Sequence, residues 1–165
     1  MAFFIYCDEF SRKVGKSLGP VVFVTGDTVS EKMAGAAVRC TELSRIVATK
    51  HQVSVTSLNN KSTRNTTASW FFYPSGSAAR TRVLAKSRVI VLQGFSSREI
   101  PQSIITSKTH FIVIDLYCPY WLENSAKSSS SASIDVHQHR LDISILRDQL
   151  RFGDFFCAHR NGSAI

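Results

Sequence analysis

Residues 21–39 read VVFVTGDTVSEKMAGAAVR, and this stretch decides the fold. Its first five residues are apolar and mostly β-branched and stop at Gly26, which is typical of a strand buried on both faces in a parallel sheet. From Ala36 the apolar residues recur at three- and four-residue steps, which predicts a helix with one buried face. Residues 51–56 then alternate as a second strand and close a β-α-β unit. The apolar positions assigned to the buried face of the helix are Ala37, Cys40, Leu43, Ile46 and Val47.

The loop between this strand and the helix is the first place to look for a binding site. In a right-handed β-α-β unit the ligand crevice lies beyond the carboxyl ends of the strands. The loop from Gly26 to Gly35 lies there, and we expect Glu31, Lys32, Gly35 and Arg39 to contribute to binding. An alternative for Arg39 is an ordinary cation on the surface of the helix.

Two later strands repeat the opening pattern. Residues 87–94, SRVIVLQG, and 110–115, HFIVID, are continuous apolar runs that end in polar residues or glycine. Gln93, Gly94 and Asp115 therefore follow strands of the same sense, and we expect them on one rim with the first loop. The sequence predicts an α/β three-layer Rossmann-like domain with a mostly parallel sheet. Residues 78–86 have helical composition.

The end of the chain has its own pattern. From residue 134 the sequence predicts an amphipathic helix that places Leu141, Ile145, Leu146 and Leu150 on its apolar face. Residues 1–18 are interpreted as an N-terminal extension and 19–165 as a single domain. Residues 59–67 and the low-complexity segment 126–133 are expected to be loops.

Composition excludes several classes of protein. At 165 residues with 44% hydrophobic and 19% charged content, the chain has the composition of an ordinary globular domain. No apolar run is long enough to span a bilayer, and the first residues lack the pattern of a secretory signal, so we expect a cytoplasmic protein. The four cysteines form no CxxC pair, and His137 and His139 diverge on a helix, so we expect no metal site and no cofactor.

Positive charge is concentrated in the middle of the chain. The formal net charge is +8, and residues 51–110 hold eight Lys or Arg against one acidic residue. Such a segment can attract an anionic membrane surface or nucleic acid, although a solvated basic surface is the alternative. Within it, Trp70 and the three aromatic residues after it suit either a platform that stacks on bases or sugars or a short core strand.

Three elements of the sequence resemble family-4-type retaining glycosyltransferases of the GT-B fold. The first covers residues 26–56, with EKMAG at 31–35, Arg39, ELSR at 42–45 and HQVSV at 51–55. The second is VLQG at 91–94, and the third is DLYCPYWLE at 115–123. GDFFCA at 153–158 resembles a further strand of these enzymes, so the resemblance runs from about Gly19 to Ala158.

The resemblance implies transfer of a sugar from a nucleotide donor to a lipid- or saccharide-linked acceptor. It implies a catalytic role for Asp115 and binding roles for Gln93, Gly94, Tyr117, Cys118 and Glu123. Cys118 stands where the resembling sequences usually have a second Asp. The resembling enzymes continue into a second α/β domain that binds the sugar nucleotide, so we expect this chain to be the acceptor-side half and inactive alone.

Two alternatives remain from the sequence. One is a non-catalytic α/β binding domain, and the other is a basic module for nucleic acid or a membrane surface. Nucleic acid is the less favoured partner, because no recognised nucleic-acid-binding motif is present. The chain has neither a GxGxxG dinucleotide fingerprint nor a GxxxxGK[ST] phosphate loop, which argues against dehydrogenases and nucleoside triphosphatases. If the anionic surface is the inner face of a membrane, we expect the protein to bind it as a peripheral membrane protein.

Overall fold

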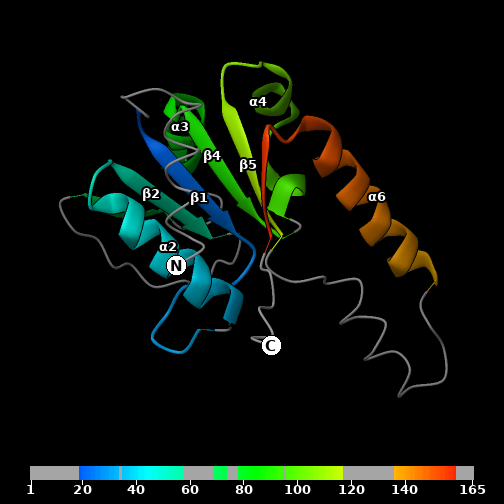
Figure 1. The fold of residues 1–165 in the computed structure, drawn as a ribbon, viewed down its shortest axis with the longest axis horizontal. Coiled ribbons are helices and arrows are strands. Elements are labelled where there is room, and N and C mark those ends of the chain that lie inside the picture. Colours follow the sequence, from blue (N-terminus) through cyan, green and yellow to red (C-terminus); the bar gives the residue numbers. More distant parts are fainter. Residues whose placement is uncertain are drawn as a thin grey trace, which may run out of the picture.

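The computed structural model describes residues 19–33, 35–57, 69–73, 78–94, 96–116 and 136–158 (Figure 1). The loop at 59–67, the low-complexity segment 126–133 and the N-terminal extension 1–18 lie outside the described residues. Helices and strands alternate along the chain. The elements are β1 (Val21–Thr25), α2 (Gly35–Ala48), β2 (Val53–Ser57), β3 (Trp70–Tyr73), α3 (Ala78–Lys86), β4 (Val89–Gln93), the 3₁₀ helix η1 (Ser96–Glu99), α4 (Gln102–Thr106), β5 (Phe111–Leu116), α6 (Val136–Phe152) and β6 (Phe155–Ala158).

The six described strands form one sheet in the order β3-β2-β1-β4-β5-β6, and every neighbouring pair is parallel. This is the Rossmann order, in which the chain starts at the centre, builds one half outward and then returns to build the other. The order reverses between β1 and β4, so the crevice beyond their carboxyl ends is the expected ligand position. The predicted α/β Rossmann-like class is confirmed.

Two hydrophobic layers cover the sheet. On one face, α2 packs over side chains of β1, β2 and β3, and Cys40 lies at the centre of that layer. On the other face, Leu84 of α3, Ile104 of α4 and Phe152 of α6 pack against β1, β4 and β5. Figure 1 shows α2 in front of the sheet and α6 along the β5–β6 side. The predicted three-layer arrangement follows from these two faces.

The buried face of α2 is the predicted one except at Ile46, and Leu43 and Val47 are partly buried against the core. Ala37 and Cys40 are buried as expected, but Ile46 is 49% exposed, and Thr41 and Ser44 are buried in its place. Both hydroxyls are satisfied within the helix, since Thr41 donates to the Ala37 carbonyl and Ser44 to the Thr41 carbonyl. A polar residue with a local hydrogen bond can therefore occupy a core position that an apolar pattern would not assign to it.

In α6 the correction is larger. Ile145 is buried as predicted, but Leu150 is 52% exposed, whereas Asp142 and Gln149 are buried. The inward face is therefore Asp142, Ile145 and Gln149, at the three- and four-residue steps of a helix. The apolar pattern indicated a neighbouring face and wrongly placed Asp142 away from the core, because two of the inward positions are polar.

The turn between α6 and β6 requires glycine. A Cβ on Gly153 would lie 2.7 Å from Ile114 Cγ1, closer than side chains approach one another. The Gly153 N–H donates to the Gln149 carbonyl, which ends the helix, and the Asp154 N–H donates to the Ile112 carbonyl beside β5. Gly153 thus lets α6 end close against β5.

Among the described residues, no helix is both long and apolar enough to cross a membrane.

Candidate functional site

The carboxyl edge of the sheet collects polar residues from three central strands. Thr25 ends β1, Gln93 ends β4, and Asp115 lies opposite Gln93 in the register of β4 and β5. All three side chains are buried, at 5% exposure or less. We define the carboxyl rim as these residues together with Gly94 and Arg39. As predicted, the first loop, Gln93-Gly94 and Asp115 lie at one edge of one sheet (Figure 1).

Arg39 and Asp115 form the central contact of the carboxyl rim. Arg39 Nε and Nη2 donate to Asp115 Oδ2 and Oδ1, both at 3.1 Å. This is a two-point pairing of a planar guanidinium with a carboxylate, which is stronger and more directional than a single contact. The Asp115 side chain is 3% exposed and that of Arg39 is 18% exposed. The alternative of Arg39 as an ordinary surface cation is therefore excluded, and Arg39 is the accessible member of the pair.

Gln93 holds the strands and the helix together. Its Oε1 accepts from Thr25 Oγ1 at 2.8 Å, and its Nε2 donates to the Ala36 carbonyl at 2.7 Å. The amide therefore joins β1, β4 and the first turn of α2. Because both ends of the amide are engaged in these protein contacts and the side chain is buried, this geometry favours a positioning role for Gln93.

Gly94 turns the chain sharply at the end of β4. Its φ is +58°, a conformation that glycine adopts without the steric penalty of a Cβ. Its N–H donates to the Asp115 carbonyl at 3.2 Å, and its own carbonyl accepts from Gln149 Nε2 at 2.6 Å. Gln149 was not predicted from the sequence, and only the four-residue step from Ile145, the buried apolar position of α6, could have indicated it. It links α6 to the carboxyl rim.

The loop before α2 contributes exposed groups. Glu31 and Lys32 are both exposed, and no ion pair among the described residues includes either of them. Gly35, the first residue of α2, is also exposed. The loop is fixed at its base, where Ser57 donates to the Asp27 carbonyl at 2.7 Å. Glu31 and Lys32 thus lie in the loop that follows β1 at the carboxyl edge of the sheet, and their exposure makes them accessible to a ligand.

Cys40 lies directly beneath the rim but carries no reactive thiolate. Its burial, followed by the charges of Asp115 and Asp27, raises the pKa of the thiol far above its ordinary value. A thiol in this environment stays protonated at neutral pH, and nucleophilic chemistry requires the thiolate. Cys40 is therefore a core residue, while Cys157 is half-buried; both are free cysteines.

Tyr117, Cys118 and Glu123 lie outside the described residues, and their binding roles stay predictions. Among the described residues, no group of three His, Cys, Asp or Glu side chains is placed to hold a metal ion.

Trp70 belongs to the core. It is 3% exposed, its Nε1 donates to Ser44 Oγ at 2.7 Å, and the Arg45 guanidinium lies 5.8 Å from its ring centroid. A ring buried in this way offers no face for a base or a sugar, so the short core strand is the correct interpretation. In the basic segment, Arg80 is also buried, at 8% exposure, so it does not belong to a solvated basic face.

The described chain is thus a Rossmann-like α/β domain with a polar carboxyl rim at its topological switch point. No family model matches the sequence, and searches among curated proteins and among solved structures find no match either.

Proposed function

We propose that this chain is the acceptor-side, N-terminal domain of a sugar-nucleotide-dependent retaining glycosyltransferase of the GT-B type. The observation that supports this most is the paired Arg39 and Asp115 at the switch point. Arg39 belongs to the first element of the resemblance and Asp115 to the third. Gly94 of the second element donates to the Asp115 carbonyl, and Gln93 is the register partner of Asp115. Elements far apart in sequence therefore meet at the position where this fold binds ligands.

The exposure of the side chains assigns roles within the proposed site. Arg39 is the accessible partner, so we propose that its guanidinium contacts a phosphate or hydroxyl oxygen of the ligand. Asp115 is almost fully buried, which favours holding that guanidinium in place over direct attack on substrate. Lys32 and Glu31, both exposed, are proposed to contact an acceptor or the donor diphosphate. The nucleotide sugar and a lipid- or saccharide-linked acceptor are the proposed substrates.

We expect the isolated 165-residue chain to transfer no sugar. Stabilising a leaving diphosphate requires groups from both sides of a closed cleft, and this domain provides one side. The measurement is release of nucleoside diphosphate from a panel of UDP- and GDP-linked sugars, with a simple glycoside as acceptor. Turnover that Asp115→Asn abolishes would show that one domain suffices and would contradict this part of the proposal.

We also propose that the protein is cytoplasmic and meets an anionic membrane surface through the exposed cations of the basic segment. Arg82 and Lys86 of α3 and Arg88 after it are all exposed. Each cation near such a surface contributes about 1 kcal/mol. We therefore expect the protein to co-sediment with anionic but not neutral liposomes, and less at higher salt. Equal recovery in both supernatants would leave these cations as solvated surface.

A further inference from the structure

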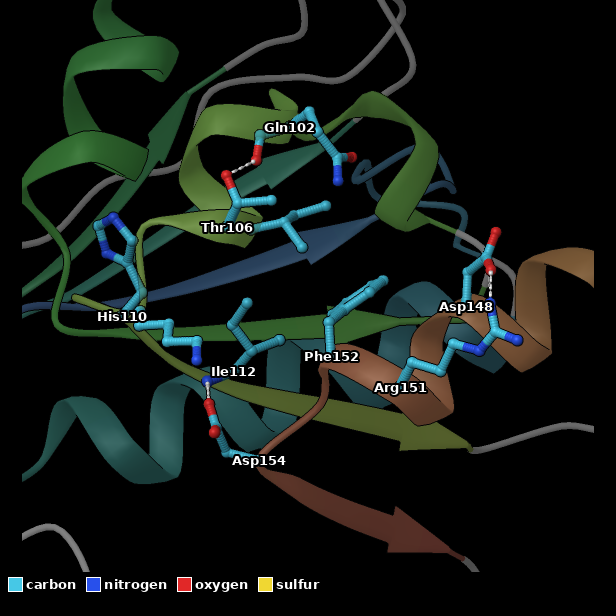
Figure 2. Close-up of a pocket in the computed structure, with 10 residues that line it drawn as sticks. Gln102, Thr106, His110, Ile112, Asp148, Arg151, Phe152 and Asp154 are labelled. Carbon is cyan, nitrogen blue, oxygen red and sulfur yellow. Dashed lines mark hydrogen bonds and ion pairs between the residues drawn. The ribbon is translucent and has the colours of Figure 1, made fainter.

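A cavity lies at the amino edge of the sheet, opposite the carboxyl rim. It has a volume of about 800 Å³ and lies between α4, the start of β5 and the end of α6 (Figure 2). Pockets for small organic ligands usually have volumes of about 300 to 1,000 Å³. All of its lining residues are described, and none belongs to the carboxyl rim. They are Gln102, Ile105, Thr106, Lys108, His110, Ile112, Asp148, Arg151, Phe152 and Asp154.

The middle of this cavity is apolar. Figure 2 shows Ile112 and Phe152 between His110 on one side of the view and Arg151 on the other. Ile105 adds a third apolar side chain, and it packs in the same hydrophobic layer as Phe152. Apolar side chains flanked by a few polar groups are the usual composition of a small-molecule site.

The charged groups of the cavity differ in how firmly the protein engages them. Asp154 Oδ2 accepts from the Ile112 N–H at 2.8 Å, which commits that oxygen to the start of β5. Asp148 lies 3.7 Å from Arg151, and both side chains are more than 60% exposed, so this pair holds Arg151 only weakly. Lys108 forms no ion pair with any residue that the structure describes.

The backbone places Lys108 at a conformational cost. Its φ is +52°, in the left-handed region just after α4, where helices commonly end on glycine or asparagine. A lysine is strained there, whereas glycine would not be. An unpaired cation in a strained conformation on the wall of a cavity points to a role in binding.

We propose that the amino-edge cavity binds a small organic anion with an apolar body. The anionic group lies at Lys108, and the apolar body packs on Ile105, Ile112 and Phe152. This site is separate from the proposed acceptor site, because the two lie at opposite ends of the strands.

The test titrates the full chain, labelled with ¹⁵N, with benzyl phosphate, benzyl alcohol and inorganic phosphate. We expect benzyl phosphate to shift the amide signals of Lys108, Ile112 and Phe152, and to bind at least about tenfold more tightly than either fragment. Lys108→Asn removes the charge but keeps a residue that tolerates the left-handed conformation, and it should raise the Kd about tenfold. The control is Lys50→Asn, an exposed lysine that does not line the cavity.

Three results would overturn the proposal. One is equal binding of benzyl alcohol and benzyl phosphate, which would mean that the cations take no part. Another is an equal loss of affinity in Lys108→Asn and Lys50→Asn, which would indicate general charge attraction. The third is the absence of shifts at Lys108, Ile112 and Phe152. Because asparagine suits the backbone at position 108, the thermal unfolding of Lys108→Asn should match that of the wild type, and any lost affinity then reports on the charge.

Discussion

Replacing Asp115 by alanine is expected to lower the free energy of unfolding by about 3 kcal/mol, because it removes the carboxylate that accepts two hydrogen bonds from the largely buried Arg39 guanidinium. Removing one member of a buried ion pair costs about 3 to 5 kcal/mol. The remaining exposure of the Arg39 side chain, 18%, places the expected value at the lower end. Urea denaturation measures this loss as a shift of the midpoint at constant slope.

The chain offers a matched control for this variant. Glu42 and Arg45 form an ion pair at 3.3 Å on the outer face of α2, and both side chains are at least half exposed. Glu42→Ala should change the free energy of unfolding by less than about 0.5 kcal/mol, since exposed pairs contribute little. If Asp115→Ala costs no more than Glu42→Ala, the contact between Arg39 and Asp115 is not formed as described. A double variant, Arg39→Met with Asp115→Leu, should recover part of the loss, because no unpaired charge remains.

Trp70→Ala is expected to lower the free energy of unfolding by about 3 to 5 kcal/mol, the range for a large buried aromatic side chain. The substitution removes an indole packed under α2 and leaves Ser44 without the Nε1–H that it accepts. Trp70→Phe keeps most of the apolar volume and should cost about 1 to 2 kcal/mol, chiefly through the lost hydrogen bond. Chemical denaturation of both variants gives the two values.

Ile46→Ala is the control for Trp70→Ala. Ile46 is an apolar side chain of α2, the helix that Trp70 contacts through Ser44, but it is 49% exposed, so its loss should cost less than about 1 kcal/mol. The stacking interpretation of Trp70 makes the opposite prediction. It requires Trp70→Ala to weaken binding of single-stranded nucleic acid while stability stays unchanged. That pair of results would contradict the buried position of the ring.

The sequence was most informative about the strands of the sheet. Residues 21–25 and 89–93 are continuous apolar runs, and both are central strands buried on both faces. An unbroken run of this kind needs cover on two sides, which a parallel sheet between helices provides. The position of Asp115 at the carboxyl rim followed from the same reasoning, because parallel strands share one edge for their carboxyl ends.

Specific side-chain partners were not predictable in this way. Arg39 and Asp115 are 76 residues apart, and the topology places them at one edge without saying that they pair. The burial of Gln149 was not predicted, and Asp142 was wrongly predicted to lie on another face of the helix, because buried polar residues break the apolar periodicity on which helix faces are predicted. The left-handed conformation of Lys108 could not be predicted from the sequence, because glycine and asparagine are the residues that usually adopt it after a helix.

The most direct test of the central claim is whether a phosphorylated sugar binds at the carboxyl rim. Glucose 1-phosphate, titrated into the ¹⁵N-labelled chain, should shift the amide signals of Gly26, Gly94 and Asp115 with a Kd in the range of about 1 mM or weaker. Lys32→Ala, an exposed change that leaves the core intact, should weaken binding by about threefold or more, whereas Lys50→Ala should not. Shifts that avoid all three rim amides, or that appear only around Lys108 at the other edge, would contradict the assignment of the rim as the sugar site.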